Sequence, residues 1–353
     1  MVAMLALAGW SMPAWAADYP DPATDDFTIR DFHFESGESL PELRIHYRTI
    51  GTLHRNAAGK ADNAVLVLHG TSGSGGSFLS YSFAGQLFGE GQVLDAKRYF
   101  IILPDNIGHG DSSKPSDGLH ARFPRYCYHD MLQAQYRLVT EKLGIDHLRL
   151  VMGTSMGGMH TWMWGEIHPE MVDALMPLAS APVAIAGRNR MIRRMMIDSI
   201  RGDPEWKDGE YTVQPRGLEG AMFALFIMLS SPLELYKEAP TREEADRYFD
   251  DWIAERRRRS DANDFLYQFE SSGDYNPSPD LEKIRAPLFA INSADDEVNP
   301  PELGFLEREI KRVAKGRYIL LPVSGNTHGH GTHSQPEVWG KYLSELLRIS
   351  QPH

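Results

Sequence analysis

A Gly-x-Ser-x-Gly motif at residues 153–157 places Ser155 where an apolar segment, 148–152, runs into a segment of helical character that begins near Met156. A serine in such a strand–turn–helix context stands exposed at the turn and can attack a carbonyl carbon. Glycine is needed on both sides of Ser155 because a Cβ there would clash with the neighbouring strand or helix. The Met156 N–H would lie at the positive helix end, where a developing oxyanion is stabilised. We therefore predict a nucleophilic Ser155 with Met156 as one oxyanion donor.

A serine hydroxyl is a poor nucleophile until an imidazole removes its proton and a carboxylate holds that imidazole in place. The carboxylate is predicted just after the apolar run 287–292, where three adjacent residues compete for the role: Asp295, Asp296 and Glu297. We choose Asp296 because the Asp-x-Val-x-Pro spacing places it after the predicted strand and before the proline that begins the next segment.

The base is predicted in the glycine-rich loop after the last apolar run, which carries His328, His330 and His333. We choose His330 because it lies between two glycines and can reach toward Ser155 most freely. The His-x-His-x-x-His spacing could instead indicate a metal site. No acidic or cysteine ligand accompanies it locally, so we predict neither a metal nor another cofactor.

Two further residues could be mistaken for catalytic groups. Cys127 is the single cysteine and lies away from any glycine-rich turn, so we expect a half-buried structural thiol and no disulfide within the chain. His109 precedes the nucleophile in the chain and lies in a glycine-containing loop, so we expect it to have a structural role there.

Six apolar segments predict the strands that position these groups: 63–68, 99–104, 148–152, 174–178, 287–292 and 318–321. Near-continuous apolar runs are typical of strands buried on both faces of a parallel sheet. Residues 27–34 and 43–50 alternate apolar and polar side chains, which predicts an antiparallel pair with its turn at Gly37 and Glu38. The first apolar run ends in His-Gly and enters a glycine-rich loop, which we predict to supply the Thr71 N–H as the second oxyanion donor.

Helices are predicted at 131–143, from Met156 to Ile167, and at 339–347. Residues 183–275 are rich in methionine and arginine and contain no buried strand, so we predict a helical lid over the catalytic end of the sheet. The basic run 256–259 is expected to be the solvated end of a helix without a function of its own.

The chain has 353 residues, of which 42% are hydrophobic and 24% charged, as expected for one large α/β domain with an insertion. Its net charge of −12 argues against a nucleic-acid partner. Residues 1–16 are apolar and end in Ala-Trp-Ala, which predicts a signal peptide and a periplasmic or secreted protein. No other stretch is long and apolar enough to span a membrane. The predicted domains are a core at 17–182 and 276–353, with the lid at 183–275.

These motifs resemble the homoserine O-acetyltransferase-like family of α/β-hydrolases over nearly the whole chain that follows the signal peptide. The stretches that carry the resemblance are 89–100, 123–131, the turn at 153–159, 203–211, 296–301 and 329–330. The resemblance implies an α/β-hydrolase fold, in which a mostly parallel central sheet is flanked by helices and carries a helical lid insertion. It also implies the chain order Ser…Asp…His, and a homodimer formed through the lid.

Two positions depart from the members of that family that acetylate homoserine. Those members carry an Asp directly after the catalytic His, for the ammonium group, where this chain has Gly331. They carry a lid Arg for the carboxylate, where this chain has Met222, which we expect to make the pocket more apolar. Each lost charged hydrogen bond would cost about 1.5–3 kcal/mol of binding. The sequence therefore favours a serine hydrolase that cleaves carboxylic esters of small or medium acyl chains. An O-acyltransferase is the alternative, and an inactive scaffold is a third, disfavoured possibility.

Overall fold

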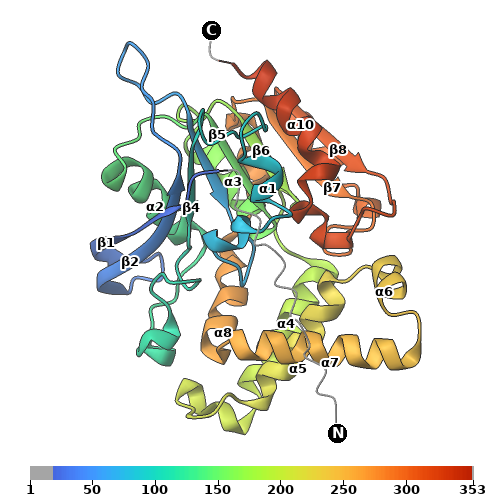
Figure 1. Ribbon diagram of the computed structural model, residues 1–353. Coiled ribbons are helices and arrows are strands. Elements are labelled where there is room, and N and C mark those ends of the chain that lie inside the picture. Colours follow the sequence, from blue (N-terminus) through green and yellow to red (C-terminus); the bar gives the residue numbers. More distant parts are fainter. Residues whose placement is uncertain (1–18, 352–353) are drawn as a thin grey trace, which may run out of the picture.

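The computed structural model describes residues 19–351, so the predicted signal peptide at 1–16 lies outside the described residues. One sheet of eight strands has the order β1-β2-β4-β3-β5-β6-β7-β8 (Figure 1). Strands β3 to β8 are parallel, whereas β1 and β2 form an antiparallel hairpin whose second strand pairs antiparallel with β4. The predicted, mostly parallel central sheet is confirmed. Its strands are β1 (Ala23–His33), β2 (Ser39–Ile50), β3 (Ala64–Leu68), β4 (Phe100–Pro104), β5 (Leu150–Thr154), β6 (Leu175–Leu178), β7 (Leu288–Ser293) and β8 (Gly316–Leu321).

Side chains of the parallel strands alternate between two apolar cores, because successive residues of a strand point to opposite faces of the sheet. Val65 and Val67 of β3 lie in the core that contains residues of α1 (Ala84–Leu87) and α10 (Pro336–Ile349). Leu66 and Leu68 lie in the opposite core with residues of α2 (Tyr128–Arg137), α3 (Met156–Ile167) and α9 (Phe305–Glu309). Helices therefore cover both faces of the sheet.

Helix α2 begins three residues earlier than its apolar periodicity predicts. The Asp130 carboxylate accepts a hydrogen bond from the Cys127 N–H at 2.8 Å, and the Asp274 carboxylate accepts from the N–H groups of Tyr128 and His129. These carboxylates satisfy N–H groups that have no partner within the helix. Two carboxylates therefore stabilise the first turn of α2, and one of them, Asp274, is distant in sequence. The periodicity of apolar residues carries no information about these hydrogen bonds, so it places the start of the helix too late.

Beside one end of the sheet lie five further helices, and all of them except the third contribute residues to a separate apolar core (Figure 1). They are α4 (Gly187–Arg201), α5 (Arg216–Leu229), α6 (Pro232–Glu238), α7 (Arg242–Arg259) and α8 (Ala262–Glu270). Among residues 19–351, no single helix has the length and apolar character to cross a membrane. Helices α5 and α6 meet that criterion only when taken together, and the chain bends by 104° between them.

Candidate active site

Ser155 occupies a tight turn between the end of β5 and the start of α3. Its backbone has φ of 53° and ψ of −112°, a conformation that residues other than glycine rarely adopt and that costs of order 1–3 kcal/mol. A Cβ on Gly153 would lie 2.3 Å from the Gly157 carbonyl carbon, and one on Gly157 would lie 1.9 Å from the Leu68 carbonyl oxygen. The expectation that glycine is required on both sides of Ser155 is confirmed.

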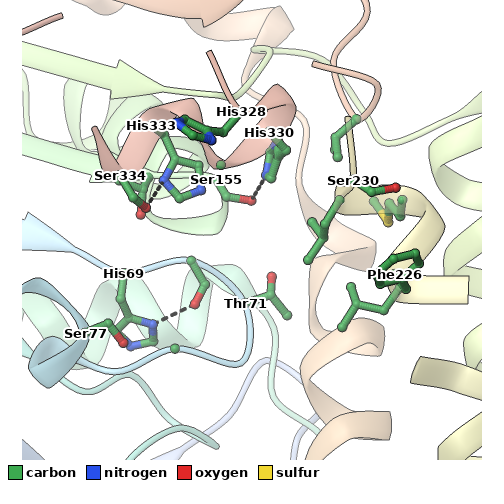
Figure 2. Close-up of a pocket in the computed structure, with 18 of the residues that line it drawn as sticks. His69, Thr71, Ser77, Ser155, Phe226, Ser230, His328, His330, His333 and Ser334 are labelled. Carbon is green, nitrogen blue, oxygen red and sulfur yellow. Dashed lines mark hydrogen bonds between the residues drawn. The ribbon is translucent and has the colours of Figure 1, made fainter. Parts of the chain in front are cut away.

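A chain of hydrogen bonds leads from Ser155 to a buried carboxylate. The distance from Ser155 Oγ to His330 Nε2 is 2.8 Å, and Figure 2 shows the His330 ring directed at this oxygen. The other ring nitrogen, Nδ1, lies 3.0 Å from both carboxylate oxygens of Asp296. With hydrogen on Nδ1, His330 donates to Asp296 and leaves Nε2 free to accept the serine proton. The structure therefore brings together the three residues that were selected from the sequence.

The Asp296 carboxylate is held in its ionised form. Burial acts to raise the pKa of Asp296, but the charge of His330 and hydrogen bonds from His330, Asn299 and the Val298 N–H outweigh it and lower the pKa. The Val298 N–H donates to this carboxylate at 2.8 Å and the Asn299 side-chain amide at 3.2 Å. An ionised carboxylate at this place can hold the imidazole in one tautomer and stabilise its cation.

The two other acids of this loop have different partners. Asp295 accepts a hydrogen bond from the Gly329 N–H at 3.0 Å and another from the Ser293 hydroxyl. Glu297 forms an ion pair with Arg188 on α4. Neither side chain is directed at His330, so the structure separates Asp296 from its neighbours in the way the sequence spacing suggested.

The two other histidines are likewise engaged elsewhere. His328 Nδ1 lies 2.6 Å from a carboxylate oxygen of Glu234 on α6. His333 Nδ1 lies 2.8 Å from the Ser334 hydroxyl, and burial, followed by the nearby His330, lowers the pKa of His333 to about 3. His333 therefore stays neutral at ordinary pH, and the three histidines have separate partners.

The loop that was predicted to supply the second oxyanion donor lies against the nucleophile. A Cβ on Gly70 would lie 3.3 Å from the Ser155 Cβ, and Thr71 lines the same cavity as Ser155 (Figure 2). Burial lowers the pKa of His69, so its neutral ring can bond the Gly70 carbonyl through Nδ1 at 2.8 Å and accept the Asn106 N–H at Nε2. These bonds fix the loop.

A cavity of about 450 Å³ opens above Ser155, between the sheet and the helices α4 to α8. Its apolar wall includes residues of α5 such as Leu225, Phe226 and Met228. Met222 is fully buried in the core of the helices and is not among the lining residues. The expectation that Met222 makes the pocket more apolar is therefore wrong, because this side chain faces the neighbouring helices instead. Gly331 does line the cavity.

Sequence reasoning missed three charged residues that line this cavity: Arg193, Arg256 and Glu234. The expectation that the whole run 256–259 is solvated is wrong for Arg256, which is partly buried and lies over the Trp252 ring at 4.9 Å. A signal for Arg193 was present, since it precedes the buried Met196, Ile197 and Ile200 by three, four and seven residues. That spacing places Arg193 on the buried face of α4.

Cys127 and His109 do not line this cavity. Cys127 is half-buried, as expected, and burial raises the pKa of its thiol. His109 is buried, and its Nδ1 lies 2.9 Å from the Ile107 carbonyl oxygen within its own loop. Both observations fit structural roles.

Comparison with known proteins gives matches over most of the chain. Residues 63–304 match the family model described as alpha/beta hydrolase fold. A probable acyltransferase of Methanothermobacter thermautotrophicus is 31% identical over 278 residues, which cover 78% of this chain and 84% of that protein. A homoserine O-acetyltransferase of Moorella thermoacetica is 33% identical over an alignment of 344 residues, and the match covers 84% of this chain and 88% of that protein.

Solved structures with this fold include proteins of two activities. A homoserine O-acetyltransferase from Bacillus anthracis has a TM-score of 0.80 at 21% identity and covers 92% of this chain and 97% of its own. An acetylester hydrolase from Corynebacterium glutamicum has a TM-score of 0.78 at 21% identity and covers 92% of this chain and 96% of its own. The fold is therefore compatible with both transfer and hydrolysis.

Proposed function

Since this chain belongs to the α/β-hydrolase fold family, in its homoserine O-acetyltransferase-like group, we propose that it is a serine esterase that cleaves carboxylic esters through an acyl-enzyme on Ser155. Membership of this family confirms the predicted fold and makes the protein an enzyme of the α/β-hydrolase superfamily. The observation that carries the proposal is the hydrogen-bonded series Ser155, His330 and Asp296, of which Ser155 and His330 line the cavity and Asp296 is buried behind them.

In the proposed reaction, Ser155 Oγ attacks the ester carbonyl carbon while His330 Nε2 takes its proton. The carbonyl electron pair moves onto oxygen, where the N–H groups of Thr71 and Met156 stabilise the negative charge. The bond to the alcohol oxygen then breaks, and His330 returns the proton to the leaving alcohol. Water attacks the acyl-enzyme in the same way, with His330 as base, and releases the carboxylic acid and free Ser155.

Hydrolysis is favoured over transfer to homoserine by the groups around His330. Gly331 stands where the homoserine-acetylating members carry an Asp for the ammonium group. Glu234 is the one acid among the residues that line the cavity, and it is already bound to His328 at 2.6 Å. An ammonium group would therefore find no free carboxylate among the described lining residues. An O-acyltransferase with another acceptor remains the second candidate, because the named relatives include a probable acyltransferase.

The fate of the acyl group tests the proposal. Purified protein is given p-nitrophenyl acetate in the presence of L-homoserine, and acetate and O-acetylhomoserine are both quantified. We expect nearly all acetyl groups to appear as acetate, with turnover absent in the Ser155→Ala variant. Dominant formation of O-acetylhomoserine would replace the esterase with the transferase.

We also propose export to the periplasm or medium, as the pattern of residues 1–16 suggests. Cell fractionation with N-terminal sequencing of the recovered protein tests this. Export predicts a mature chain that begins near Ala17 outside the cytoplasm. A cytoplasmic chain that retains residues 1–16 would contradict it.

A further inference from the structure

Arg193 is a buried cation inside the cavity that holds Ser155. It projects from α4, is 3% exposed, and lines the cavity together with Thr71, Ser155 and His330. Figure 2 shows Thr71 and Ser155 on facing sides of the space that these residues enclose. The reaction described above makes no use of this arginine.

The contacts of the Arg193 guanidinium are all with neutral groups. Nε donates to Asn189 Oδ1 at 2.9 Å, and Nη1 donates to the Ser272 hydroxyl at 3.2 Å. The Phe269 ring lies 5.4 Å from the guanidinium carbon. Within residues 19–351, no carboxylate lies within 4.0 Å of Arg193, and the neighbouring Tyr128 hydroxyl is a further neutral contact. A guanidinium stays protonated in proteins, so its charge has no acidic partner inside the cavity.

Two other arginines of this chain that are shielded from water have acidic partners. Arg149 is 5% exposed and lies 4.0 Å from Asp173. Arg48 lies 3.0 Å from the fully buried Asp105. Buried charges are normally paired, because an uncompensated charge away from water is unfavourable. Arg193 therefore lacks the acidic partner that a buried arginine normally has, and no acid of the described residues takes that role.

The surroundings of Arg193 leave its charge uncompensated. Burial lowers the pKa of Arg193, and the adjacent Tyr128 phenol opposes this only in part. Burial also raises the pKa of Tyr128, so this phenol is neutral and brings no negative charge to Arg193. Arg256 adds a second positive charge to the cavity wall, and Glu234 is the one acidic residue that lines it. The residues that line the cavity thus carry a surplus of positive charge.

We propose that Arg193 binds a carboxylate carried by the substrate, so that the substrates of this enzyme are esters with a negatively charged group. The carboxylate would take the place of the missing acidic partner and accept charge-assisted hydrogen bonds from the Arg193 guanidinium, as carboxylates bound to Arg do elsewhere. This proposal rests on the proposed esterase function. It makes Arg193 a specificity-determining residue.

Two pairs of esters that differ only in charge test the proposal. For a carboxylate on the acyl side, 4-nitrophenyl hydrogen succinate is compared with its methyl ester. For a carboxylate on the alcohol side, 4-acetoxybenzoate is compared with its methyl ester. We expect kcat/KM of the charged member to exceed that of the neutral one by about 10- to 100-fold in one pair, the factor that one charged hydrogen bond carries. The pair that shows it identifies the side of the ester bond that Arg193 faces.

Variants separate recognition from structure. In Arg193→Met, the preference for the charged ester should disappear while kcat/KM for the neutral esters stays within a few-fold of wild type. Arg190→Met removes an equal charge from an exposed position on the same helix and should keep the preference. Equal losses on charged and neutral esters in Arg193→Met, or no preference in the wild type, would overturn the proposal.

Two further experiments apply if Arg193→Met does not fold or if the wild type cleaves no ester. If Arg193→Met does not fold, Arg193→Lys should retain part of the preference, because the cation is kept while the fork of donors is lost. If the wild type cleaves no ester, the esterase function fails, and the thermal shift caused by monomethyl succinate decides about Arg193 separately. A shift in the wild type that is clearly smaller in Arg193→Lys would support the anion site, because the cation is kept while the fork of donors is lost. No shift in the wild type would overturn it.

Discussion

Replacing Gly157 with alanine is expected to disable the site by forcing apart the two segments that meet at Ser155. A Cβ on Gly157 would lie 1.9 Å from the Leu68 carbonyl oxygen and 2.9 Å from the His69 carbonyl oxygen. Ordinary contact begins at 3.4 Å, so β3 or α3 must move by about 1.5 Å. Both are backbone elements of a packed core, and neither can yield as a flexible side chain would.

The size of the effect follows from two opposing contributions. Alanine is better than glycine in a helix interior by about 1 kcal/mol, whereas overpacking a well-packed core costs about 1–3 kcal/mol. A displacement of this size should cost close to the upper limit of about 3 kcal/mol. After the gain in helix propensity is subtracted, we expect the free energy of unfolding to fall by about 2 kcal/mol. Because His69 leads directly into the loop that carries Thr71, the same displacement moves the proposed oxyanion donor. Misplacement by about 1 Å can cost about 10²-fold in rate.

Urea denaturation followed by tryptophan fluorescence, together with p-nitrophenyl acetate turnover, measures both effects. Gly340→Ala is the matched control, because Gly340 lies within α10 and nothing lies within 4 Å of the place that its Cβ would take. The control should gain about 0.5–1 kcal/mol and keep full activity. A Gly157→Ala protein with wild-type stability and turnover would refute the reasoning from steric contact.

Two further predictions concern carboxylates. Asp296→Asn should lower kcat by about 10²–10⁴-fold, because the amide can stabilise the wrong tautomer of His330. The far-UV circular dichroism spectrum should stay unchanged. An undiminished kcat would show that Asp296 does not orient the base. For Asp274, burial acts to raise the pKa, but hydrogen bonds from the His129 ring and the backbone N–H groups of His129 and Tyr128 lower it to about 2 from the ordinary 3.8. A carboxyl group whose pKa is lowered by folding stabilises the protein above about pH 4, and this stability is lost as the pH falls toward 2. In urea titrations, Asp274→Asn should therefore lower the free energy of unfolding by about 2 kcal/mol at neutral pH and by progressively less below pH 4. A loss of stability that does not depend on pH would contradict this.

The catalytic end of the sheet could be predicted because its determinants are local. The turn around Ser155 is encoded by two glycines and an apolar run, and the clash distances at those glycines show why no other residue fits there. Asp296 and His330 could be selected from their neighbours because each follows a strand at a fixed offset. The structure gives Asp295, Glu297, His328 and His333 other partners, which the sequence did not reveal.

The wall formed by α4 to α8 could not be predicted to the same extent, because its side chains are sorted by the packing of helices that are distant in sequence. Helix α4 carries several arginines, and only its docking against α8 brings Arg193 into the cavity. The same packing turns Met222 into the helical core and lays Arg256 on Trp252. A basic run and a methionine-rich helix look alike in sequence whether they face solvent, a core or a substrate.

Trapping the acyl-enzyme is the most direct test of the central claim that Ser155 is the nucleophile. Protein mixed with p-nitrophenyl acetate and quenched in acid within the first turnover is digested, and the peptides are analysed by mass spectrometry. We expect one acetyl group on the peptide that contains Ser155, and none in the Ser155→Ala variant, which should also lose turnover. An acetyl group on another residue, or full turnover in Ser155→Ala, would contradict the mechanism.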